Sequence, residues 1–134
     1  MHEPTDEAFE QLMSEVVAPN TRFGHRQHVQ VTWLAVRRYG PVHARRLIED
    51  GIRRTARYQG VPQKFNATVS RAWIEAVAYH LQTTPEASFD EFVTTHPALL
   101  DKRLLTRHYR STTLASPAAR IGWVPPDLAP FPWT

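Results

Sequence analysis

The sequence predicts a compact, single-domain, all-α fold of five to seven helices, followed by an extended tail rich in proline and tryptophan. Apolar residues recur at three- and four-residue steps through most of the chain, which is the period of an α-helix. No segment alternates between apolar and polar residues as a half-buried strand does. The 134 residues are the usual size of one domain.

The domain divides into three parts along the chain. Residues 1–22 form an N-terminal helix and loop, residues 23–122 form the helical core, and residues 123–134 form the tail. The apolar periodicity predicts long helices over about 5–17, 24–39, 42–59 and 67–82. Shorter helices should follow Ser88, run from Pro97 to about Leu105, and form one turn at Ser116-Pro117.

Local signals place the ends of these helices. Gly40 ends one helix and Pro41 opens the next, a common order of these two residues. Asn66 is a good N-cap, and the sequence from Ser88 to Glu91 is a capping box. Gly51 falls on the apolar stripe of its helix, where it allows another helix to approach closely.

The C-terminal segment WVPPDLAPFPWT holds four prolines and two tryptophans in twelve residues. Proline lacks a backbone N–H and clashes with the preceding turn, so this segment cannot be a helix. Large aromatic side chains gain most from burial. We therefore expect the tail to lie along the body of the domain.

Composition restricts the class of protein. The absence of cysteine excludes disulfides, thiolate metal sites and a cysteine nucleophile. No apolar run approaches the roughly 20 residues of a membrane span, and the acidic N-terminus does not resemble a signal peptide. We expect a soluble cytoplasmic protein without a membrane partner.

Positive charge is concentrated in the middle of the chain. Eleven Lys or Arg residues stand against three acidic ones between Pro19 and His80, and fourteen of the sixteen basic residues are Arg. Such a surface is either a solvated helix face or a site for anionic partners, which Arg suits better than Lys. A nucleic-acid partner is not expected, because no short recognition-helix pattern or aromatic-basic platform is present.

His25 and His28 are the first candidates for chemistry. They share a helical stripe with Thr32, Val36 and Tyr39, so both should face inward. Three interpretations remain open: a catalytic acid–base pair, two ligands of a metal, or polar residues that bond to loops at a helix start. A metal would need a third ligand, from His80 or His108, and we otherwise expect no cofactor.

Aromatic and basic residues could complete a pocket. Trp33 and Trp73 are either core residues or a flat wall for an aromatic ligand. In the segment LLDKRLLTRHYR, cationic side chains next to His108 and Tyr109 are either a solvated face or an anion clamp beside an acid or base. The candidate clamp residues are Arg107 and Arg110.

At FGHRQHVQVTWLAVRRYGP the chain resembles a family of small bacterial all-helical proteins with an F-x-H-x-x-H motif. The resemblance continues through GVPQKFNATVSRAW, SFDEFVTTHPALLDKRLLTRHY and the late SPAAR and GWVPPDL segments, covering about residues 22–128. It implies a pocket at Phe23, His25 and His28 and a matching RHY motif at 107–109, but no particular activity.

The chain departs from the family pattern at Asn66. Members tend to carry a Tyr-His-Glu-Thr-like motif where this chain reads Phe65-Asn66-Ala67-Thr68. Asn is a poor ligand for transition metals and carries no titratable proton. If the family pocket binds a metal through that position, we expect the site to be lost or weakened here, with Asn66 left to bind substrate.

These features lead to a hypothesis of cofactor-independent acid–base catalysis on a small molecule in a specialised bacterial biosynthetic pathway. The sharpest form is a condensation or cyclisation, similar to a Pictet–Spengler reaction, of an aromatic amine with an anionic aldehyde. His25, His28 or His108 would move protons, the tryptophans would stack on the ring, and arginines would hold the anion. The alternatives are a metal-dependent enzyme using His25 and His28, and a non-catalytic binding or accessory protein.

Overall fold

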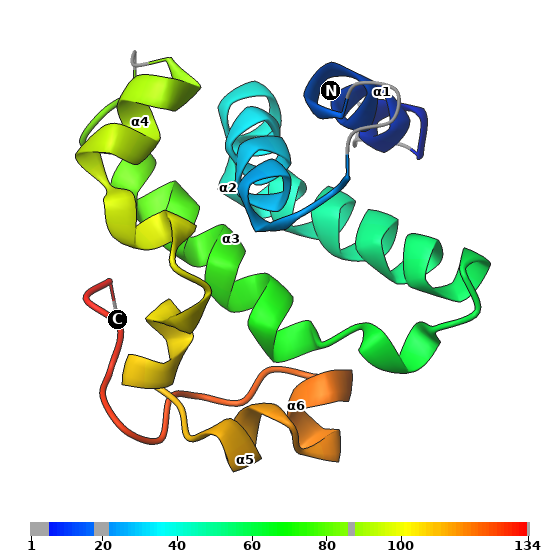
Figure 1. Ribbon diagram of the computed structural model, residues 1–134, viewed down its shortest axis with the longest axis vertical. Coiled ribbons are helices and arrows are strands. Elements are labelled where there is room, and N and C mark those ends of the chain that lie inside the picture. The colour runs from blue at the N-terminus through cyan, green and yellow to red at the C-terminus, as the bar shows by residue number, and fades with distance from the viewer. Residues whose placement is uncertain (1–5, 18–21, 86–87, 134) are drawn as a thin grey trace.

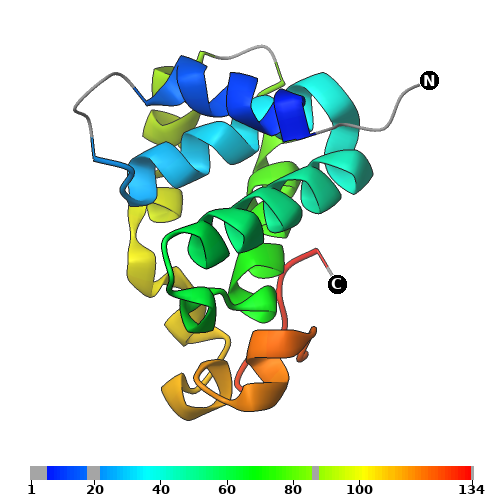
Figure 2. The same cartoon turned by 90° about the vertical axis from the view of Figure 1, so that its right-hand side faces the viewer.

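A computed structural model describes residues 6–17, 22–85 and 88–133. These residues are helical or irregular and include no strand, which confirms the predicted all-α class. Figures 1 and 2 show α1 lying across α2, and α3 running beside α2 with the tail along its other side. The elements are α1 (Asp6–Val16), α2 (His25–Tyr58), η1 (Pro62–Lys64), α3 (Ala67–Leu81), α4 (Phe89–Thr95), η2 (Pro97–Leu100), η3 (Lys102–Arg107), α5 (Ser111–Leu114) and α6 (Pro117–Ile121), where η marks a 3-10 helix.

The long element α2 is two helices joined at a kink. Gly40 has φ 80° and ψ 163°, a conformation that residues with a Cβ rarely adopt. Pro41 follows directly and cannot donate a hydrogen bond to the preceding turn. The predicted break at Gly40-Pro41 is confirmed, and with α2 counted as two helices the described residues contain seven α-helices.

The core lies between α2, α3 and the helices that cover them. Asn66 caps α3 by accepting a hydrogen bond from the amide of Val69, as predicted. Ser88 and Glu91 form the predicted capping box of α4. The buried apolar side chains form one cluster that spans all the long helices and includes Leu12, Val29, Ile48, Ile74, Val77, Phe92 and Leu99.

Gly51 marks the point where α1 crosses α2. It is buried, and a Cβ built on it would overlap the ring of Phe9 from α1. In an open helix, Gly→Ala stabilises by about 1 kcal/mol. Here we expect Gly51→Ala to lower the free energy of unfolding by about 1–3 kcal/mol, because the ring must move from a packed position. Urea denaturation measures this loss.

A second substitution tests the cause of that effect. Phe9→Leu removes the ring, so Gly51→Ala in that background should cost much less, giving a favourable coupling energy between the two positions. Equal costs in both backgrounds would contradict a clash between this pair.

The segment 97–107 differs from its prediction as one helix. It forms two 3-10 helices, η2 and η3, which are separated by Asp101 in an extended conformation (φ −93°, ψ 111°). The Asp101 carboxylate accepts hydrogen bonds from both the backbone amide and the guanidinium of Arg103. An Asp side chain that bonds to nearby backbone competes with helix formation, and this local competition ends the first helix.

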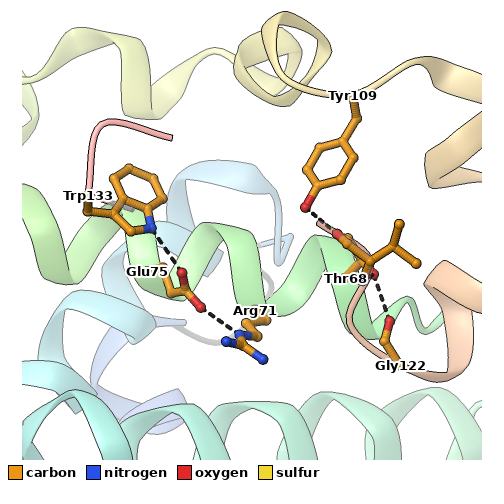
Figure 3. Close-up of polar contacts among 7 residues, drawn as sticks. Thr68, Arg71, Glu75, Tyr109, Gly122 and Trp133 are labelled. Carbon is orange, nitrogen blue, oxygen red and sulfur yellow. Dashed lines mark hydrogen bonds and ion pairs between the residues drawn. The ribbon is translucent and has the colours of Figure 1, made fainter. Parts of the chain in front are cut away.

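The tail lies along the body, as predicted. Phe131 is buried and stacks on Trp133 with ring centroids 4.6 Å apart. The Trp133 indole donates a hydrogen bond to Glu75 of α3, which also pairs with Arg71 (Figure 3). The fully buried Thr68 hydroxyl donates to the carbonyl of Gly122 at 2.7 Å and accepts from the amide of Val124. These bonds fix the start and the end of the tail on α3.

Candidate functional site

His25 and His28 lie in the first turn of α2 but differ in their surroundings. The His25 Nε2–H donates a hydrogen bond to the carbonyl of Leu99 at 2.8 Å, and its ring meets Trp73 edge to face at 4.6 Å between centroids. His28 is partly buried beside the ring of Phe23. His25 therefore makes a structural contact between the first turn of α2 and η2.

Burial lowers the pKa of both histidines. The pKa of His25 falls because desolvation outweighs the hydrogen bond to Leu99. Desolvation, with a smaller contribution from the charge of His25, lowers the pKa of His28 to about 4. Both imidazoles are therefore mainly neutral near pH 7, and His28 is a weaker base than an ordinary histidine.

Three other predicted site residues make structural hydrogen bonds. His108 Nδ1 bonds to the carbonyl of Ala129. The buried Tyr109 hydroxyl donates to the carbonyl of Val124 at 2.6 Å (Figure 3), and burial raises its pKa to about 12. The Asn66 amide donates to the carbonyl of Leu114 at 2.7 Å. The bonds of His108 and Tyr109 hold the tail against the segment that follows η3, and the bond of Asn66 ties the end of α5 to the start of α3.

The predicted aromatic residues lie in the core. Trp33 packs against Phe89 and Phe92, with the guanidinium of Arg37 over its ring. Its buried indole N–H finds no hydrogen-bond partner among the described residues. Trp73 is buried, whereas Arg107 and Arg110 are exposed. None of the nine predicted site residues lines any of five surface pockets in the described part of the chain. Their catalytic or binding roles stay predictions.

The structure also brings together two histidines that the sequence analysis did not predict to be neighbours. His80 at the end of α3 and His96 after α4 have ring centroids 4.5 Å apart. The Oγ1 atoms of Thr83 and Thr84 lie 3.4 and 3.3 Å from His96 Nε2. Burial lowers the pKa of each ring, and the charge of His96 lowers that of His80 further. The sequence signal for this pair was limited to His96, which stands directly before Pro97 at the end of a predicted helix.

A metal site is not evident from side-chain placement. Among the residues that the structure describes, no group of three or more His, Asp or Glu side chains could hold an ion. The pair His25 and His28 therefore gains no third ligand there, and neither does the pair His80 and His96. Within the same residues, no helix combines the length and apolar character that a membrane crossing requires.

A basic surface pocket is lined by three arginines. This arginine pocket has a volume of about 670 Å³. Arg53 and Arg57 stand one turn apart on α2, and Arg120 reaches it from α6. The guanidinium of Arg53 lies 4.7 Å above the ring of Phe65, and Ile121 is 85% exposed at the margin. The lining residues are Arg53, Arg57, Pro62, Phe65, Pro117, Arg120 and Ile121.

The charge of this pocket is only weakly compensated. No carboxylate belongs to its lining. Asp50 approaches Arg53 at 3.4 Å, but both side chains are about half exposed, and such pairs contribute little. Neither Arg57 nor Arg120 makes an ion pair with another side chain in the described ranges. The pocket thus combines three arginines with the apolar residues Pro62, Phe65, Pro117 and Ile121.

No known protein family matches the chain, and neither a curated protein nor a solved structure matches it. The resemblance to small helical proteins with an F-x-H-x-x-H motif stays a prediction.

Proposed function

We propose that the protein binds a small organic anion in the arginine pocket. The observation that carries this proposal is that three arginines from two distant segments line one pocket together with apolar residues. Guanidinium groups form strong charge-assisted hydrogen bonds to phosphate and carboxylate. Ligand sites combine an apolar lining with a few polar groups that fix orientation, and they span about 300–1,000 Å³.

The lining supports a ligand with two chemical parts. Arg57 and Arg120 are available to an anionic group, since no described carboxylate pairs with them. Phe65, Pro62 and Pro117 offer apolar surface to the rest of the ligand. This proposal shares with the non-catalytic alternative from the sequence a binding role without turnover, but it concerns the arginine pocket and not the histidines.

Phenyl phosphate tests the proposal because it joins an anionic group to a flat apolar body. Calorimetric titration at low salt should show binding, and Arg57→Gln or Arg120→Gln should each weaken it by about tenfold through loss of a charge-assisted hydrogen bond. Higher ionic strength should weaken it further.

Arg107→Gln is the matched control. It removes the charge of an exposed arginine outside the pocket. The affinity of this variant for phenyl phosphate should therefore stay within about twofold of that of the parent protein. Equal affinities across all four proteins, or an equal loss in the control, would exclude the arginine pocket as the site.

A further inference from the structure

A second, apolar hollow adjoins the arginine pocket. It has a volume of about 310 Å³, and its lining combines apolar residues with Thr55, Gln59 and Lys64. The apolar lining residues are Met13, Phe23, Ile52, Ala56, Val61 and Phe65. Phe65 also lines the arginine pocket, so this one ring forms a wall of both spaces. The two hollows are neighbours on one surface.

The spacing of residues on α2 explains why the two surfaces meet. Arg53 and Arg57 are four residues apart and form one column on the helix. Ile52 and Ala56 are also four residues apart, and Ala56 lies three positions after Arg53, so they form the neighbouring column. A cationic stripe and an apolar stripe therefore run side by side along the last turns of α2.

We infer that the arginine pocket and the apolar hollow together bind a single-chain amphiphilic anion, with a phosphate or carboxylate head and an unbranched hydrocarbon chain. This inference rests on the proposed function. The head lies among Arg53, Arg57 and Arg120, and the chain passes Phe65 into the hollow beside Ile52 and Ala56. Charge complementarity selects the head, and the apolar lining selects the chain.

The geometry distinguishes this ligand from a compact anion. A compact anion needs only the guanidinium groups and leaves the hollow unused. A hydrocarbon chain removes the apolar walls at Phe23 and Val61 from water, and each buried methylene adds to the affinity. The length of the chain is thus the variable that reports on the second hollow.

Calorimetric titration of the protein with butyl, hexyl, octyl and decyl phosphate tests the inference. Each phosphate is kept below its critical micelle concentration. Affinity should rise about two- to fourfold per methylene until the hollow is filled. Arg57→Gln should weaken every member of the series by a similar factor, because it acts on the shared head.

Variants of the apolar hollow should change only the contribution of the hydrocarbon chain to the affinity. Ala56→Leu fills part of the hollow, and Gln59→Trp does so from an exposed position that should tolerate the change if Ala56→Leu does not fold. Either variant should flatten the dependence on hydrocarbon chain length, because it should lower the affinity for octyl and decyl phosphate more than the affinity for butyl phosphate.

The outcomes separate this inference from the proposed function. Binding of butyl phosphate that depends on Arg57, with no gain for longer chains, would overturn the amphiphile and leave the anion site standing. A gain with length that survives in both hollow variants would also overturn it. So would binding only to phosphatidylglycerol vesicles and to none of the free phosphates, since that would indicate a lipid surface. Absence of all binding would overturn both proposals.

Discussion

Acidification from about pH 7.5 to about pH 4.5 is expected to lower the free energy of unfolding by about 2–3 kcal/mol through His28 alone. Burial lowers the pKa of His28 to about 4, whereas the unfolded chain has the ordinary value of 6.5. Between these two values the unfolded state binds more protons, so stability is complete above about pH 6.5 and is lost as the pH falls toward 4. Urea denaturation across this range measures the slope.

Other histidines act in the same direction. Burial lowers the pKa values of His25, His80 and His96, so each of these rings also destabilises the folded protein on acidification. Their contributions are smaller than that of His28 because these rings are more exposed. Glu49 opposes them, because burial raises its pKa and favours its protonated form in the folded state. The free energy of unfolding should still fall on acidification, in the direction set by the histidines.

Substitution assigns the slope to a residue. His28→Leu removes the titrating ring and should flatten the pH dependence most, and His80→Gln should flatten it less. A pH slope that is unchanged in His28→Leu would show that this ring titrates at its ordinary value in the folded protein.

Thr68→Val is expected to cost about 2–4 kcal/mol of folding free energy. Valine keeps the shape of the side chain but removes an oxygen that bonds to two backbone groups, the carbonyl of Gly122 and the amide of Val124 (Figure 3). Leaving buried polar groups without partners costs about 1–3 kcal/mol each. Chemical denaturation gives the loss, and faster amide hydrogen exchange at Val124 should accompany it.

Thr32→Val provides a matched control. Thr32 is as buried as Thr68, but its hydroxyl donates only to the carbonyl of His28 one turn back in the same helix. That carbonyl lies inside α2, where it keeps its backbone hydrogen bond when the hydroxyl is removed. The substitution should therefore cost less than about 1 kcal/mol. Equal losses at the two positions would contradict a special role for Thr68 in holding the tail.

Helix ends could be predicted from sequence because their causes are local. The Gly40-Pro41 break, the Asn66 cap and the Ser88 capping box each depend on residues within one turn. The division of 97–107 into two 3-10 helices depends on whether the Asp101 side chain bonds to its own backbone. Apolar periodicity carries no information about that choice.

The candidate site could be predicted only in part. The basic residues between Pro19 and His80 were interpreted either as a solvated helix face or as a site for anionic partners. Arg120 and Phe65 join Arg53 only through the packing of α6 and the η1 turn. The inward position of His25 followed from its helical stripe. Its acceptor, Leu99, is 74 positions away, and no spacing rule connects the two.

The bonds of Thr68 also have a kinetic consequence. They join residues separated by 54 and 56 positions, whereas α1 packs against α2 and α2 against α3, each the next α-helix along the chain. Such distant contacts require closure of a long loop, which slows the search for the native state. The helices can pair before the tail closes over α3. Closure of the tail is then a late folding event, and its bonds mainly determine how slowly the native protein unfolds.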